Sequence, residues 1–264
     1  MNKLRKYGVI FKVSVQNQLA YLSGFVSGFV FYAFVIFIFI NLWKVIYAGR
    51  GTISGFSYQQ VIWYCIITEM IVMSAGGGIF ADVSGDIKNG NIGYYLNKPY
   101  NYLFYNFANS MGAVALKLAI NAAIGISMGL LLVGRLESFK LLYLPLIVPG
   151  VIFGIFLNFL LFSSVGLLAF WFEENSAFFW VVQKTLFMGG LFFPLDMMPD
   201  WLKNLALLLP FSYVTYAPAK LFTAFNLGDF AWMTGVQGLY IGVLLFVNLL
   251  VYRKGVKAVN VNGG

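Results

Sequence analysis

The sequence predicts an all-α membrane protein that forms a single transmembrane domain over residues 1–264. The chain is 61% hydrophobic and only 10% charged, whereas soluble domains average about 45–50% apolar and about 25% charged residues. The apolar residues also form long runs that can cross a hydrocarbon core of about 30 Å as helices. We therefore expect six transmembrane helices, an N-terminal amphipathic interfacial helix and a re-entrant helical hairpin before the last span.

Residues 1–21 are expected to form the amphipathic helix that lies in the membrane interface. Basic and amide side chains such as Lys6 and Gln16 are interspersed with apolar ones such as Ile10 and Phe11 at roughly helical spacing. An ordinary solvated leader is the alternative for this segment.

Six apolar runs, separated by polar breaks, follow the leader. The second run ends in SAGGGIF, whose glycines weaken a helix. The third contains Gly125 and Gly129, a pair at the spacing that lets membrane helices approach closely. The expected spans are residues 22–48, 58–80, 110–133, 141–172, 177–194 and 231–252.

Residues 195–225 differ from the spans because prolines repeatedly interrupt an apolar stretch. A proline in a helix interior removes a hydrogen-bond donor and breaks the helix, so this segment cannot form one continuous span. Its apolar side chains also disfavour water, which predicts short helices that re-enter the outer leaflet and form an external gate. The expected gate residues are Pro194, Pro199, Trp201, Pro210 and Phe211.

An even number of spans places both termini on the same side of the membrane. On that side lie nine Lys and Arg residues near the span ends, against six on the other. Cytoplasmic loops carry the excess of Lys and Arg, and the cluster before the first span usually dominates. We therefore expect a multi-pass protein with both termini, and the polar loop Gly85–Pro99, in the cytoplasm.

Composition excludes several kinds of chemistry. Histidine is absent and Cys65 is the single cysteine, so neither a zinc site nor a disulfide framework can be built. The phosphate-binding pattern GxxxxGK[ST] does not occur, so we expect no ATP site, no catalytic residue, no metal and no cofactor bound by this chain. The net charge of +8 comes from basic residues that flank apolar runs, which favours the lipid bilayer over nucleic acid as a partner.

The few ionisable residues within the expected spans are candidates for functional sites. Glu69 lies near the middle of the second span, and Lys117 and Asn121 lie one turn apart on the third. A charged side chain that faced lipid at this depth would cost about 2.5–3.5 kcal/mol, so Glu69 should face protein. Two interpretations stay open: Glu69 is protonated or pairs with Lys117 to hold two helices together, or these residues line a transport path.

The loop between the second and third spans, GDIKNGNIGYYLNKP, is the longest polar interruption on the expected cytoplasmic side. Its glycine-acidic-aliphatic start and closing Leu-x-x-Pro resemble the coupling loop of permease subunits of ATP-binding-cassette exporters of the second permease type. The residues assigned to this ATPase-coupling loop are Gly85, Asp86, Ile87, Lys88, Gly90, Leu96 and Pro99.

Two other parts resemble the same family. The proline-cut segment is similar to the family's hairpin before the last span, and the leader resembles its connecting helix along the inner leaflet. The order of parts around six spans is similar to that of small multidrug or viologen exporter permeases. The resemblance implies a permease in the inner (cytoplasmic) membrane that works with a second copy or a homologous permease. It also implies two ATPase subunits that hold ATP and Mg²⁺, and export of a hydrophobic or amphipathic compound.

Two other functions compete with this one. A proton-coupled secondary transporter would use Glu69 and Lys117 as its coupling pair, but the sequence has no detectable internal repeat of the kind such folds often carry. A membrane-embedded lipid-modifying enzyme is the third hypothesis. The absence of histidine and the scarcity of carboxylates in the loops disfavour its hydrolytic and metal-dependent forms.

Overall fold

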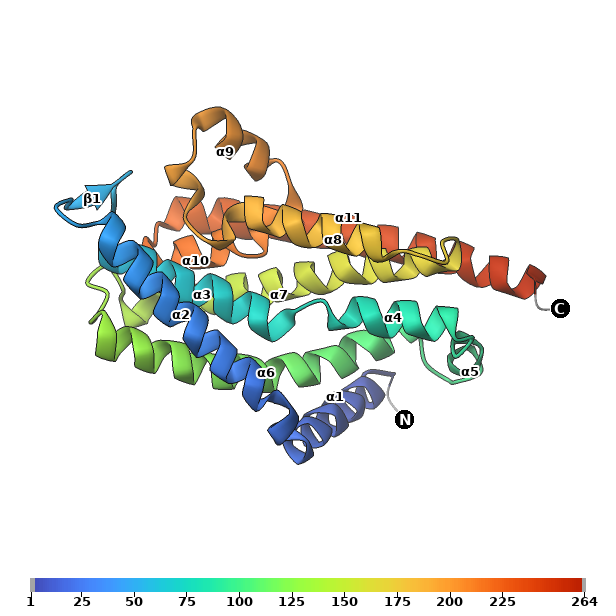
Figure 1. Cartoon of the computed structure of the whole chain (residues 1–264). Coiled ribbons are helices and arrows are strands. Elements are labelled where there is room, and N and C mark those ends of the chain that lie inside the picture. The colour runs from blue at the N-terminus through green and yellow to red at the C-terminus, as the bar shows by residue number, and fades with distance from the viewer. Residues whose placement is uncertain (1–2, 263–264) are drawn as a thin grey trace.

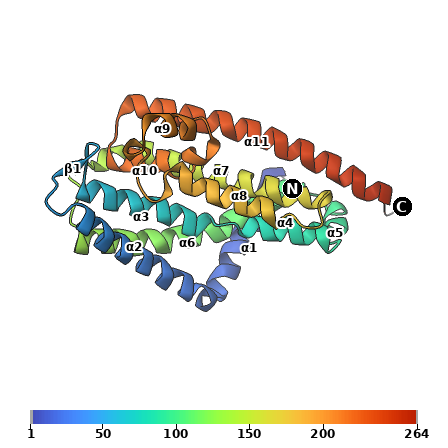
Figure 2. The same ribbon diagram turned by 45° about the horizontal axis from the view of Figure 1, so that its top comes forward.

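A computed structural model of the chain describes residues 3–262, which form an elongated helical bundle (Figure 1). Long helices run along its length (Figures 1 and 2). They are α2 (Val26–Ile46), α3 (Tyr58–Ala75), α6 (Tyr102–Leu132), α7 (Leu144–Leu167) and α11 (Leu227–Asn262). A two-stranded antiparallel hairpin, β1 (Thr52–Ile53) and β2 (Phe56–Ser57), lies at one end. The short helix α5 (Ile92–Leu96) and the last turns of α11 lie toward the other.

Five helical stretches of the described chain are long and apolar enough to cross a membrane. They are Ser23–Ile46, Tyr58–Lys88, Tyr102–Leu132, Leu141–Phe170 and Leu227–Ala258. The prediction of a helical membrane protein is confirmed at this level, but the predicted fifth span, 177–194, is not among the five. In its place lie α8 (Ser176–Leu186), 11 residues long, and a π-helical turn at Phe187–Leu191. Gly190, with φ 89°, interrupts the regular helix there.

The predicted amphipathic leader contains α1 (Lys3–Ala20), while residues 1 and 2 lie outside the described part. α1 packs against the first half of α6, where Ser14 Oγ donates a hydrogen bond to the Asn109 carbonyl at 2.6 Å. Lys6 Nζ donates to the Pro99 carbonyl at 2.6 Å. The start of the chain therefore lies beside the end of the predicted coupling loop. A 3-10 turn, Leu22–Phe25, joins α1 to α2.

The second predicted span, 58–80, is two helices rather than one. Ser57 and Gln60 form a capping box that starts α3. At Gly76 the backbone turns to φ −28° and ψ 176°, which ends the helix. A new helix, α4 (Gly78–Lys88), then extends beyond residue 80. A side chain on Gly77 would collide with the ring of Phe179, so the break is also a point of close helix packing.

The third predicted span, 110–133, begins earlier than expected. The Asn101 side chain accepts hydrogen bonds from the backbone amides of Leu103 and Phe104, and this N-cap starts α6 at Tyr102. Further along α6, Tyr32 and Ile66 pack on Gly125. Trp63 and Ile66 pack on Gly129, as the spacing of small residues predicts.

α7 and α11 pack along each other and carry polar contacts at two levels. Gln237 Nε2 donates to the carbonyls of Gly150, at 3.0 Å, and Tyr213, at 2.8 Å. Asn248 Nδ2 donates to the Leu160 carbonyl at 3.1 Å. Amides buried in this way fix the register of the two helices, because a shift would leave their donors without acceptors. Two 3-10 turns, Leu141–Tyr143 and Leu168–Phe170, flank α7.

The proline-cut segment forms four short helical pieces between the π-helical turn and α11. The pieces are a 3-10 turn at Leu195–Met197, α9 (Asp200–Leu207), a 3-10 turn at Pro210–Tyr213 and α10 (Tyr216–Thr223). α10 packs on α3 and α7, whereas α9 projects from the side of the bundle (Figure 1).

Candidate functional site

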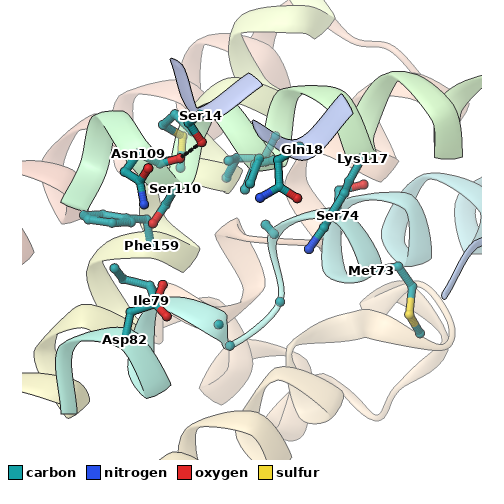
Figure 3. A pocket seen from close by; sticks show the side chains of 18 of the residues that line it. Ser14, Gln18, Met73, Ser74, Ile79, Asp82, Asn109, Ser110, Lys117 and Phe159 are labelled. Carbon is teal, nitrogen blue, oxygen red and sulfur yellow. Dashed lines mark hydrogen bonds between the residues drawn. The ribbon is translucent and has the colours of Figure 1, made fainter. Parts of the chain in front are cut away.

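A cavity of about 300 Å³ lies between α1, the α3–α4 break, α6 and α7 (Figure 3). The backbone of Gly76, Gly77 and Gly78 forms part of its wall, because the broken helix leaves these glycines without covering side chains. Its polar side chains come from α1, α3, α4 and α6: Ser14, Gln18, Ser74, Asp82, Asn109, Ser110 and Lys117.

Two opposite charges lie on opposite sides of this cavity (Figure 3). Asp82 comes from α4 and Lys117 from α6. Lys117 Nζ lies 4.6 Å from the centroid of the Phe25 ring, an attractive cation–π distance. Neither Asp82 nor Lys117 forms an ion pair within 4.0 Å among the described residues.

Asn121, the third predicted residue of this group, is 2% exposed. Its Nδ2 donates to Ser74 Oγ at 3.0 Å, while its Oδ1 has no partner. Asn121 and Lys117 line a second cavity of about 210 Å³, whose other walls include Phe25, Phe29 and Met73. Phe25, Met73 and Lys117 belong to both cavities, which therefore adjoin.

Glu69 does not belong to this site. It lies in the buried part of α3, 2% exposed, near Tyr32 and Cys65. Glu69 and Lys117 form no ion pair within 4.0 Å among the described residues, and Asp82 is the acidic residue that faces Lys117 across the cavity. The salt bridge that was one of the interpretations for Glu69 is therefore not formed in the structure, and a protonated Glu69 stays a prediction.

The predicted coupling loop, Gly85–Pro99, is largely helical. Its first residues complete α4, and α5 follows after a turn in which Gly90 has φ 73°. Ile87 and Ile92 are buried against the bundle. The Asp86 carboxylate accepts a hydrogen bond from the Tyr102 hydroxyl at 2.9 Å.

The exposed side of this segment is polar and aromatic. Lys88, Asn89 and Gly90 are exposed, and the Tyr94 ring, 62% exposed, lies 4.0 Å from Lys98 Nζ. Leu96 is half-buried and Pro99 is exposed. The exposed surface of this segment is therefore the α4–α5 turn and Tyr94, and the side chain of Ile87 is not part of it.

In the predicted external gate, prolines begin the short helical pieces. Pro194 and Pro199 are N-caps, and Pro210 is at the first position of its turn, where the missing N–H group costs no helical hydrogen bond. Trp201 on α9 is 69% exposed. Phe211 lies in van der Waals contact with Gly189, where there is no room for a side chain.

A carboxylate with two lysines holds these pieces together. Asp196 accepts hydrogen bonds from Lys203 Nζ at 2.7 Å, from Lys220 Nζ at 2.8 and 3.0 Å, and from the Tyr216 hydroxyl at 2.9 Å. Burial alone would raise the pKa of Asp196, but the hydrogen bonds from Lys203, Lys220 and Tyr216 and the charge of Lys220 outweigh it and lower the pKa. The network links the turn after Pro194 to both α9 and α10.

Replacing Asp196 with asparagine is expected to destabilise the protein by about 1–2 kcal/mol, the lower part of the range for charged hydrogen bonds because Lys203 stays partly exposed. Because folding lowers the pKa of Asp196, its contribution is complete above the ordinary pKa of 3.8 and is lost as the pH falls through the lowered value. Thermal unfolding in detergent at several pH values measures both effects. The exposed Asp200→Asn is the matched control, and equal melting temperatures for the two variants would contradict the prediction.

A comparison with protein families gives one match, to the ABC-2 family transporter protein model, over residues 13–263. The chain belongs to this family. No curated protein matches the chain. The ABC-2 match covers every helix described here apart from the first turns of α1. It confirms the resemblance inferred from the coupling loop, the hairpin and the leader.

Sequence reasoning about this ABC-2 protein missed Asp82 and Asp196. Asp82 sits next to the expected loop and was not considered as an intramembrane charge. The glycines of SAGGGIF were a usable signal, since a helix break exposes the residues just after it. Asp196 gave no comparable signal, because its partners Lys203 and Lys220 are brought to it only by the folding of the hairpin.

Proposed function

We propose that the protein is the permease subunit of an ATP-binding-cassette exporter and moves a hydrophobic or amphipathic compound with energy from a separate ATPase subunit. The observation that carries this proposal is the ABC-2 family match over nearly the whole chain. The adjoining cavities, with charged, polar and aromatic walls, are compatible with an amphipathic cargo.

In this proposal the ATPase binds at the α4–α5 turn. The turn and α5 lie toward the end of the bundle opposite the β-hairpin, and Lys88 and Tyr94 are exposed there. Two ATPase subunits, which hold ATP and Mg²⁺, would serve a pair of permeases, either two copies of this chain or this chain and a homologous permease. Asp86 and Ile87 would position the turn from within, since both are tied to the bundle.

We also place the protein in the inner (cytoplasmic) membrane, with both termini and the α4–α5 turn in the cytoplasm. α8 and the π-helical turn would make the sixth crossing, and the hairpin after it would re-enter from outside and act as the external gate. Support comes from the contact of Lys6 with Pro99 and from the stacking of Tyr102 on Tyr252, 5.8 Å between centroids. These contacts bring the two terminal helices to the same end as the turn.

This orientation predicts the labelling of two single-cysteine variants made in a Cys65→Ser background. A cysteine introduced by Asp200→Cys, on the exposed start of α9, should react with a membrane-impermeant maleimide added to intact cells. A cysteine introduced by Asn89→Cys, in the α4–α5 turn, should react only in inverted membrane vesicles. The opposite pattern would invert the topology and remove the basis for placing the ATPase at the α4–α5 turn.

Transport itself is tested in inverted vesicles that contain this chain and its candidate ATPase subunit. ATP should drive accumulation of a fluorescent amphipathic compound from a small panel, and the signal should vanish when either subunit is omitted. Accumulation driven by a proton gradient without the ATPase would reject the exporter in favour of secondary transport.

A further inference from the structure

The two adjoining cavities form one site with a polar lobe and an apolar lobe. The polar lobe, about 300 Å³, lies under α1 at the α3–α4 break, and the apolar lobe, about 210 Å³, extends along α2. Phe25, Phe29 and Phe31 line the apolar lobe, and the Phe31 ring is 54% exposed on the outside of the bundle. Because the outside of a transmembrane helix faces lipid, the hydrocarbon chain of a lipid can enter the apolar lobe from the bilayer.

The charges of the polar lobe suit a ligand that carries both signs. Lys117 and Asp82 face this lobe from opposite sides, and neither has an ion partner within 4.0 Å among the described residues. A purely anionic ligand would be repelled by Asp82, and a purely cationic one by Lys117. A zwitterion can place its anionic group at Lys117 and its cationic group at Asp82.

An unpaired acceptor in the polar lobe decides which zwitterion fits. Gln18 Oε1 is covered and accepts no hydrogen bond in the described structure. A covered acceptor without a donor is unfavourable, so a ligand with N–H groups would be favoured. A primary ammonium provides three N–H donors, whereas a trimethylated ammonium provides none.

We propose that this two-lobed cavity binds a membrane amphiphile with a phosphoethanolamine headgroup. The phosphate lies at Lys117, the ammonium lies between Asp82 and Gln18, and one hydrophobic chain occupies the apolar lobe beside Phe25 and Phe29. The site goes beyond the proposed transport activity. It requires no ATPase, so it can be tested on the isolated chain, and its failure would leave the exporter proposal untouched.

The test measures binding of phosphatidylethanolamine, with a fluorophore on one acyl chain, to the full-length protein purified in detergent. Unlabelled phosphatidylethanolamine should compete about tenfold better than phosphatidylcholine, which lacks N–H donors, or phosphatidylglycerol, which lacks the ammonium. Soluble phosphoethanolamine should compete much more weakly than the lipid, because it leaves the apolar lobe empty. Equal competition by the three lipids, or by the soluble headgroup, would overturn the proposal.

Variants locate the binding in the cavity. Lys117→Met and Asp82→Asn should each weaken phosphatidylethanolamine binding about tenfold or more. Lys184→Met is the matched control for the lysine, because Lys184 also lies over a phenylalanine ring, that of Phe187 at 5.4 Å, but lines neither lobe. Unchanged binding in folded Lys117→Met protein would reject the site.

A second pair of variants tests the apolar lobe without altering any charge. Gly28 lines this lobe and has open space where a side chain would begin, so Gly28→Leu should fill the lobe and leave the fold intact. It should weaken binding of the labelled lipid but not the weak binding of soluble phosphoethanolamine. Gly235→Leu, on the exposed face of α11, is the control. If the Gly28→Leu variant binds the labelled lipid with the affinity of the wild type, no acyl chain enters the apolar lobe, and this result would also overturn the proposal.

Discussion

Replacing Tyr94 with aspartate is expected to abolish co-purification of the permease with its ATPase and to leave the permease folded. Tyr94 is the most exposed aromatic side chain of the α4–α5 segment, at 62%, and the ring stands beside Lys98. A tyrosine that is a hot spot of an interface contributes about 2 kcal/mol or more, so its loss lowers affinity about 30-fold. A carboxylate buried without a partner weakens the complex further.

Two control variants separate loss of the interface from loss of the fold. Tyr94→Phe keeps the ring and should retain the ATPase. Ile87→Asp places a charge at a position that is only 9% exposed, so it should reduce the yield of folded permease and not act on the ATPase alone. Retention of the ATPase by the Tyr94→Asp variant would exclude the α4–α5 turn as the docking surface.

The helices were predictable because hydrophobic length alone specifies a membrane span. The apolar runs at 22–48, 141–172 and 231–252 correspond to long helices, with ends that differ by a few residues. The remaining helix boundaries depend on single residues whose effect a hydropathy profile does not include. Asn101 starts α6 early because its amide caps the helix, and Gly76 divides the second span without ending it.

The site could be predicted only in part, because its contacts join residues far apart in the chain. Lys117 and Asn121 were identified as rare polar residues in an apolar run; Lys117 lines both cavities and Asn121 lines the smaller one. Their neighbours could not be assigned, since α1 and the α3–α4 break meet α6 only in the folded bundle. Glu69 was grouped with Lys117 on chemistry alone, but Lys117 lines both cavities and Glu69 lines neither.

The largest effect on stability is expected from Gly190→Ala, one atom added at the turn between α8 and the hairpin. Gly190 has φ 89°, a conformation that costs a residue with a side chain about 1–3 kcal/mol. The new Cβ would also meet the Tyr64 hydroxyl at 2.9 Å, Tyr216 Cβ at 3.0 Å and Leu195 Cγ at 3.2 Å. Overpacking of a filled site adds about 1–3 kcal/mol. The Tyr64 hydroxyl also donates to the Gly190 carbonyl, so movement of the turn would break that hydrogen bond as well.

Thermal and denaturant unfolding of the purified protein in detergent would measure this loss. The matched control is Gly238→Ala on α11, where the helix is regular and no atom lies within 4 Å of the added Cβ. Alanine is the better helix former by about 0.8–1 kcal/mol, so this variant should be as stable as the wild type or slightly more stable. If the Gly190→Ala protein has the same melting temperature as the Gly238→Ala control, the turn can relax away from Tyr64 and Tyr216, and the prediction is wrong.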